Sequence, residues 1–300
     1  MKHLPNGLRP VPAGSTIGVI APAGPAAPEA VAAIGPWLAA RGFRSQVFAG
    51  CRERCDYLAG EDPVRLADLH AAFADPAVDA ILCMRGGYGS ARLLDKIDYE
   101  LIRRHAKPFV GYSDITALHC AFARAAGMAG IHGPMLTSDL LDAEDATSAD
   151  ALFRMLAGGL VSGTDLPSGE ARLATLAGGS AHGPLVGGNL SVLCSLLGTP
   201  WAVDTRDAIL FIEDIGEEAY RIDRLLTQLR LAGKLDAAAG FLIGNFSNAG
   251  DPAEVICALL APLGKPILAG WPSGHCHPNY PLPINVAVLL DADAQRLKVI

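Results

Sequence analysis

Two stretches decide how this chain folds: AILCMRGGYG at residues 80–89 and PFVGYSDIT at residues 108–116. Each opens with a short run that is apolar at every position, followed by a turn of small residues and then by a helical pattern. A strand that is apolar on both faces is buried on both, as in a parallel sheet covered by helices. The two stretches therefore predict an α/β fold built on a parallel sheet.

The rest of the first half repeats this alternation. Apolar runs and helical patterns follow one another at residues 16–22, 28–41, 45–48, 63–73 and 115–126. Alternating strands and helices are typical of a sheet with helices on both faces. Ligands gather at the carboxyl ends of the strands in such sheets, so we expect a site where residues 85–89 and 111–114 follow their strands.

The character of the sequence changes after about residue 143, where glycine and proline become frequent. We interpret residues 161–183 as a linker or crossover between an N-terminal domain at residues 1–160 and a smaller C-terminal domain at residues 184–300. The C-terminal part mixes strand and helix patterns, which predicts a mixed β/α domain. These patterns lie at residues 189–197, 208–212, 219–231, 240–244, 252–260, 267–269 and 286–290.

The composition argues against several classes of protein. The net charge is −7 and no basic run occurs, which argues against nucleic acid as the main partner. Residues 1–7 lack the apolar core of a secretory signal, and no apolar stretch is long enough to span a membrane. The seven cysteines are scattered, which suits reduced thiols in a reducing compartment. We therefore expect a cytoplasmic protein without a membrane partner.

The turn after the strand at residues 108–111 holds the first candidate for catalysis. Ser113 stands between a strand and a helix, so a tight bend would hold its side chain out of the sheet, near the first amides of the helix. This is the logic of a nucleophile elbow, although Ile115 occupies the position of the last glycine of G-x-S-x-G. Taken alone, the segment fits better a helix that Ser113 or Asp114 merely caps.

The loop RGGYG at residues 85–89 is the second candidate. Its three glycines allow a ligand to approach the backbone closely. The loop lacks the G-x-G-x-x-G spacing of dinucleotide-binding sites and the lysine of a P-loop, so it matches neither nucleotide fingerprint. A tight turn that binds no ligand is the alternative.

Two segments of the C-terminal part supply an acid and a base. Glu213 follows the apolar run at residues 208–212, where its carboxylate could orient an imidazole. A solvated acidic turn at residues 213–218 is the alternative. His275 and His277 lie in a loop with glycine and proline, which suits a general base. Their spacing also invites a metal site, but no third ligand stands close by.

A serine, an amide-rich loop, a carboxylate and a histidine are together the inventory of a Ser–His–acid hydrolase. A sequence with this set of segments resembles the LD-carboxypeptidase family, the muramoyltetrapeptide carboxypeptidases, whose relatives include the microcin-immunity peptidases. The resemblance runs over nearly the whole chain. It is carried by residues 18–24, 85–94, 111–119, 132–135, 187–190, 198–200, 213–214, 220–224 and 274–275.

The resemblance implies a fold and a triad. The fold is a flavodoxin-like N-terminal domain with a smaller C-terminal β/α domain, and the site lies in the groove between them. The catalytic residues are Ser113, Glu213 and His275. Because His277 follows in the same loop, it is the alternative for the base.

The resemblance also implies a reaction. An oxyanion hole forms at the amide of Asp114 and at an amide of the glycine loop, where Gly86 and Gly87 contact the substrate. The reaction releases the terminal D-Ala of a muropeptide tetrapeptide by cutting an L,D bond during wall recycling. The family is homodimeric and uses no metal or organic cofactor.

Two other functions stay open at this stage. One is a related hydrolase that inactivates peptidyl- or aminoacyl-nucleotide conjugates with the same triad. The other is a sensor of wall fragments that binds without turnover, because a fold does not fix a function. The presence of Ser113, Glu213 and His275 argues against the sensor.

Overall fold

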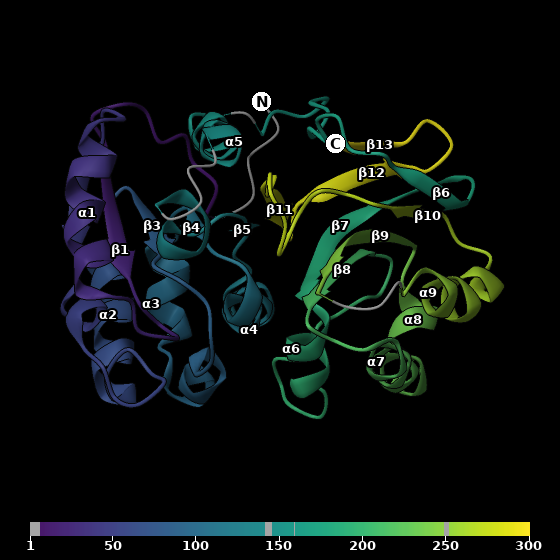
Figure 1. The fold of residues 1–300 in the computed structure, drawn as a ribbon, viewed down its shortest axis with the longest axis horizontal. Coiled ribbons are helices and arrows are strands. Elements are labelled where there is room, and N and C mark those ends of the chain that lie inside the picture. Colours follow the sequence, from purple (N-terminus) through teal and green to yellow (C-terminus); the bar gives the residue numbers. More distant parts are fainter. Residues whose placement is uncertain (1–6, 142–145, 159, 249–251) are drawn as a thin grey trace.

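The computed structural model describes residues 7–141, 146–158, 160–248 and 252–300. In these residues the chain forms two sheets that lie side by side, one built mainly by the first half of the chain and the other by the second half (Figure 1). The predicted α/β fold class, with a parallel-rich first sheet and a mixed second sheet, is confirmed.

The first sheet has six strands in the order β11-β5-β4-β3-β1-β2. Five of them run parallel, and the short strand β11 closes the edge by pairing antiparallel with β5. Every residue of β1 and β3 is buried, as their continuous apolar runs predict. The strands are β1 Thr16–Ile20, β2 Arg44–Val47, β3 Ala80–Cys83, β4 Phe109–Val110, β5 Gly130–His132 and β11 Leu282–Ile284. The helices of this half are α1 Pro28–Ala39, α2 Asp62–Ala74, α3 Tyr99–Arg104, α4 Thr116–Ala121 and α5 Ala146–Leu156.

The second sheet has seven strands in the order β13-β12-β7-β8-β9-β10-β6. Its four central strands are parallel, and antiparallel strands flank them on both sides. Figure 1 shows the helices of this half gathered on one side of the sheet. The strands are β6 Ala174–Ala177, β7 Ser180–Asn189, β8 Ile209–Ile215, β9 Gly240–Ser247, β10 Ile267–Ala269, β12 Ala287–Asp291 and β13 Arg296–Val299. The helices are α6 Leu190–Ser195, α7 Ala219–Leu231, α8 Lys234–Ala237 and α9 Ala253–Leu260.

The regular α-helix in residues 115–126 is shorter than the sequence pattern predicts. Regular α-helix covers only Thr116–Ala121, between a 3-10 turn at Ser113–Ile115 and a π-helical turn at Phe122–Ala126. π-helical turns inside helices are frequent near functional sites. The irregular winding begins at Ser113 itself, so the local geometry of that residue differs from an ordinary helix start.

The two halves are packed together, and one strand of the C-terminal half joins the sheet of the other half. β11 comes from the C-terminal part of the chain but completes the first sheet, where Leu282 pairs with His132. Both clusters of buried hydrophobic side chains contain residues of both halves. Residues 161–183 contain β6 and the start of β7, which belong to the second sheet. We keep the division into residues 1–160, 161–183 and 184–300 as a proposal.

Among the described residues, none of the helices combines the length and the apolar composition that crossing a bilayer requires.

Candidate active site

Ser113 lies at a strained turn between β4 and α4. Its φ of 61° is in the left-handed region, which non-glycine residues seldom adopt. Such conformations cluster at functional sites, because the surrounding structure must hold them in place. No side-chain hydrogen bond caps the 3-10 turn that Ser113 begins or the start of α4. The alternative in which Ser113 or Asp114 caps the helix is therefore wrong.

The glycine loop after β3 packs directly against the serine. A Cβ atom on Gly86 would lie 2.9 Å from the Cβ and 3.0 Å from the Oγ of Ser113, so a side chain there would collide with it. The carbonyl of Gly86 accepts a hydrogen bond of 3.1 Å from the amide of Gly24, which fixes the loop. Within the described part of the chain, the Gly86 amide donates to no backbone acceptor. The loop thus brings a backbone amide close to the serine hydroxyl.

The carboxyl group of Asp114 joins the serine turn to the glycine loop. It accepts a hydrogen bond from the Ser90 amide at 2.9 Å, and the Asp114 carbonyl accepts one from the Ser90 hydroxyl at 2.6 Å. The fully buried guanidinium of Arg65 donates to the carbonyls of Gly89, at 2.9 Å, and Pro22, at 2.5 Å. Burial raises the pKa of Asp114 in spite of the Ser90 hydrogen bonds. These contacts hold the two loops together as one unit.

Glu213 and His275 form a carboxylate–imidazole pair in the second half. Glu213, in β8, is completely buried, and its Oε2 lies 2.7 Å from His275 Nδ1 and accepts the His275 amide at 3.2 Å. The glycine before the histidine is required, because a Cβ on Gly274 would lie 2.6 Å from the Cδ of Glu213. Since a carboxylate only accepts, Nδ1 carries the proton and Nε2 keeps its lone pair.

The environment of His275 favours its charged form. Burial opposes protonation of the imidazole, but the hydrogen bond from His275 to Glu213 and the negative charge of that carboxylate outweigh it. The more distant charges of Asp214 and Asp139 act in the same direction, so the pKa of His275 is raised above its ordinary value. A histidine of this kind is a stronger base than an isolated one.

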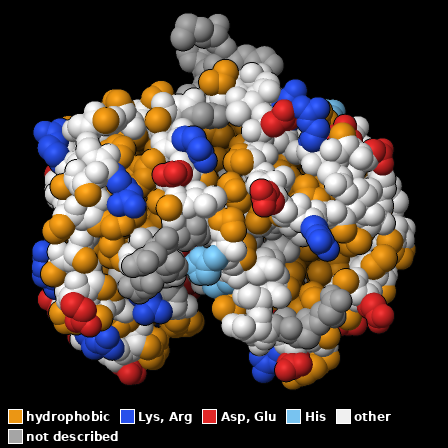
Figure 2. Space-filling model, turned by 45° about the horizontal axis from the view of Figure 1, so that its top comes forward, with side chains coloured by type: hydrophobic (Ala, Val, Ile, Leu, Met, Phe, Trp, Pro, Cys, Tyr) orange, Lys and Arg blue, Asp and Glu red, His pale blue; other side chains and the backbone are white. Residues whose placement is uncertain are grey.

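One pocket brings the two halves of the site together. It has a volume of about 500 Å³, and Ser113 and the glycine loop line it together with His275. The ring of Tyr112 lies edge-on to the ring of His275, with 4.9 Å between centroids. Among the described residues, no hydrogen bond joins the Ser113 hydroxyl to His275 in this state. In the space-filling view the molecule is hollowed between its two halves, and histidine side chains lie at the edge of the hollow (Figure 2).

His277 lies on the rim of the same pocket, and its side chain is exposed. The buried carboxylate of Glu213 contacts His275 and thereby orients that ring. A general base in a triad needs such an orienting partner. We keep His275 as the proposed base and His277 as its alternative.

The sequence analysis missed a buried acid beneath the pocket. Asp139 is 1% exposed and accepts hydrogen bonds from the Tyr112 hydroxyl at 3.1 Å and from the Met135 amide at 2.9 Å. Burial raises the pKa of Asp139 in spite of these bonds. Asp139 fixes the tyrosine ring on which His275 rests. Its position after the apolar Pro134–Leu136 segment gave no sign of this contact, which joins residues distant in the sequence.

His119 lies beside the strand end that leads into the serine turn. His119 in α4 is buried, and its Nε2 lies 2.8 Å from the carbonyl of Gly111, two residues before Ser113. Burial lowers the pKa of His119 to about 4, so the ring stays neutral. It supports the strand end that leads into the serine turn.

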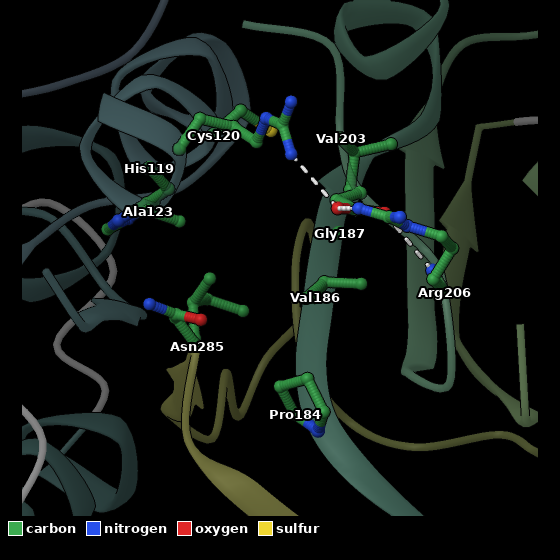
Figure 3. Close-up of a pocket in the computed structure, with 12 residues that line it drawn as sticks. His119, Cys120, Ala123, Pro184, Val186, Gly187, Val203, Arg206 and Asn285 are labelled. Atoms are coloured by element: carbon green, nitrogen blue, oxygen red, sulfur yellow. Dashed lines mark hydrogen bonds and ion pairs between the residues drawn. The ribbon is translucent and has the colours of Figure 1, made fainter. Parts of the chain in front are cut away.

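A second pocket lies between the halves but lacks these groups. Its volume is about 230 Å³, and its lining includes Arg124 and Arg206. Both guanidiniums contact the carboxylate of Asp204, at 2.9 and 2.8 Å. Figure 3 shows Arg206 among the residues that line this pocket. Each of the two cations thus already has an anionic partner. The pocket that contains Ser113 is therefore the candidate active site.

Family models match both halves of the chain. Residues 17–133 match the model of the LD-carboxypeptidase N-terminal domain, and residues 182–290 match that of the LD-carboxypeptidase C-terminal domain. The chain is 41% identical over 297 residues to a Bacillus subtilis protein named probable murein peptide carboxypeptidase, with 96% of this chain and 92% of that protein covered.

Solved structures share the fold over almost the whole chain. The crystal structure of a muramoyltetrapeptide carboxypeptidase from Oxalobacter formigenes is 28% identical, with a TM-score of 0.84, covering 95% of this chain and 98% of that one. The structure of MccF in complex with glutamyl sulfamoyl guanosine has a TM-score of 0.91, with 98% of both chains covered. At 23% identity, the second likeness concerns the fold alone.

Proposed function

The chain belongs to the LD-carboxypeptidase family, and from that premise we propose that it is a serine carboxypeptidase of murein tetrapeptides. It cuts the L,D bond and releases the terminal D-Ala. The observation that carries the proposal is the pocket in which a strained serine, a close glycine loop and a carboxylate-bound histidine meet. The names of the relatives in Bacillus subtilis and Oxalobacter formigenes support the same substrate class.

Acylation begins with the transfer of a proton. His275 Nε2 takes the proton of the Ser113 hydroxyl as the oxygen attacks the carbonyl carbon of the penultimate residue. Glu213 stabilises the imidazolium that forms, since it contacts Nδ1 at 2.7 Å. The oxyanion of the tetrahedral intermediate accepts hydrogen bonds from the amides of Gly86 and Asp114, and Gly87 shapes the loop beside them.

The intermediate then collapses. The imidazolium gives its proton to the nitrogen of D-Ala, the C–N bond breaks, and the amino acid leaves. Water enters, His275 takes one of its protons, and the acyl–Ser113 ester is hydrolysed through the same oxyanion site. Each step uses groups that line one pocket or lie directly behind its wall.

The decisive experiment measures D-Ala release from a muropeptide tetrapeptide by the wild type and by Ser113→Ala. We expect release by the wild type and a loss of about 10³-fold or more in the variant, since removing a triad nucleophile leaves only oxyanion and binding contributions. Equal rates in the two proteins would exclude Ser113 as the nucleophile. Faster cleavage of an aminoacyl-nucleotide conjugate than of the tetrapeptide would favour the immunity-type hydrolase.

We further propose that the enzyme acts in the cytoplasm as a homodimer, as the family resemblance implies. The cysteines of the described part are all free thiols, which fits a reducing compartment. Cell fractionation and light scattering of the purified protein test the two statements separately. A secreted protein, or a monomer at micromolar concentration, would contradict them.

A further inference from the structure

The candidate active site contains one cation that the catalytic steps leave unused. Arg85 lines the pocket next to the glycine loop. No carboxylate lines the pocket in the described part of the chain, because Glu213 and Asp139 are buried behind its wall. Arg85 is therefore the one permanent charge among the described lining residues, since a guanidinium stays protonated in proteins. Its guanidinium can pair with an anionic group of a ligand.

The guanidinium of Arg85 is held in place without being neutralised. Its Nη1 donates to the carbonyl of Pro25 at 3.2 Å, and its Nε would lie 3.5 Å from a Cβ on Gly24. Among the described residues, no carboxylate forms an ion pair with it, whereas Arg65 and Arg92 both contact Asp62. A guanidinium has five donors, so most of those of Arg85 remain for a ligand.

The position of Arg85 beside the serine suits contact with the terminal carboxylate of a bound peptide. It directly precedes Gly86, on which a Cβ would lie 3.0 Å from the Oγ of Ser113, and consecutive Cα atoms are about 3.8 Å apart. In the substrate, the carbonyl that is attacked and the terminal carboxylate are separated by the nitrogen and Cα of a single residue. Because Arg85 and Ser113 line the same pocket, the guanidinium is available to that carboxylate, and its planar fork suits two parallel hydrogen bonds.

We propose that Arg85 binds the free terminal carboxylate of the substrate and restricts the enzyme to removing a single terminal residue. The inference rests on the proposed function, because it supplies the feature that makes a serine peptidase a carboxypeptidase. That contact gives the site a group that recognises the end of a peptide.

The experiment compares a tetrapeptide that ends in a free carboxylate with the same peptide amidated at its terminus. We expect wild-type kcat/KM to be about 10- to 100-fold higher for the acid, since the site pairs a charged group that the amide lacks. In Arg85→Gln the acid loses most of that advantage, mainly through KM, and the amide changes little. Arg54→Gln removes an equal charge from an exposed position outside the pocket and serves as the control, with the preference unchanged.

A binding measurement separates this inference from the proposed function. In the Ser113→Ala background, calorimetry with both peptides should show a preference for the acid that Arg85→Gln abolishes, whether or not the wild type turns either peptide over. If wild type cleaves neither peptide, the proposed function is wrong while the binding result still decides the role of Arg85. A preference that survives Arg85→Gln, or an equal loss for acid and amide, overturns the inference.

Discussion

Replacing Gly86 by alanine tests the contact between the glycine loop and the serine with a single methyl group. The new Cβ would lie 2.9 Å from the Cβ and 3.0 Å from the Oγ of Ser113, and 3.5 Å from the Cε of Met135. Carbon atoms prefer a separation of about 3.5–4.0 Å, so the two residues must move apart by roughly 0.6–1 Å. Gly86 does not have a positive φ. Alanine can therefore adopt its backbone conformation, and the effect comes from the contact alone.

The displacement moves either the nucleophile or the amide that stabilises the oxyanion. Misplacement by about 1 Å can cost about 10²-fold in rate, and loss of one oxyanion donor costs about 10²–10³-fold. We expect kcat for D-Ala release to fall by about 10²-fold, with KM changed less than threefold. Overpacking costs about 1–3 kcal/mol of folding free energy, so Tm falls by several degrees while the protein remains folded.

The assay measures kcat and KM with the tetrapeptide, and Tm by calorimetry. Gly35→Ala is the matched control: its Cβ would meet the Ser45 hydroxyl at an ordinary 3.5 Å, and it lies in α1, outside the pocket. Its rate should equal that of the wild type, because the substitution lies outside the pocket. A Gly86→Ala enzyme with kcat within threefold of the wild type would refute the role of this loop in the oxyanion hole.

Four further outcomes follow from the same geometry. Glu213→Gln keeps the shape of the side chain but removes its charge, so kcat should fall by about 10³–10⁴-fold, and a fall below tenfold would contradict its role beside His275. The acid limb of kcat/KM should titrate above pH 6.5, because the pKa of His275 is raised and only the neutral imidazole accepts a proton; a limb below 6.5 would contradict this. The same shift adds folding stability that is complete below pH 6.5 and disappears as the pH rises through the raised pKa, which urea titrations across that window measure. His277→Ala should retain at least a third of the wild-type rate, whereas His275→Ala should lose about 10³-fold; the reverse order would make His277 the base.

The sequence predicts the strands best where they are apolar on both faces and misses them where glycine replaces side chains. β7 contains Gly183, Pro184 and Gly187, residues that usually interrupt a strand, and its first residues fall in the stretch expected as a linker. A Cβ on Gly187 would collide with the carbonyl of Phe211 on the neighbouring strand. These glycines permit close backbone approach in the second sheet, a reason that the local pattern cannot reveal.

The site residues, too, can be identified only in part from their own sequence segments, because the rest depends on tertiary contacts. Ser113, read from its own segment, fits a helix cap better than a nucleophile, and only its φ of 61° and the lack of a cap hydrogen bond separate the two. Glu213 and His275 are separated by 62 positions in the sequence, and β8 and the loop at Gly274 bring them together. Residue types and strand ends locate the candidates, whereas Asp139 beneath Tyr112 depends on tertiary packing alone.

The proposed triad draws its members from both halves of the molecule. Glu213 and His275 are joined by two hydrogen bonds to one buried oxygen, and they come from the same half of the molecule. Ser113 belongs to the other half, and its backbone is already strained. The halves are tied close to the site, where the Asn279 amide donates to the Ser148 hydroxyl at 2.7 Å and the Asn189 amide to the Thr116 hydroxyl at 3.0 Å. These two hydrogen bonds limit relative movement of the halves close to the site.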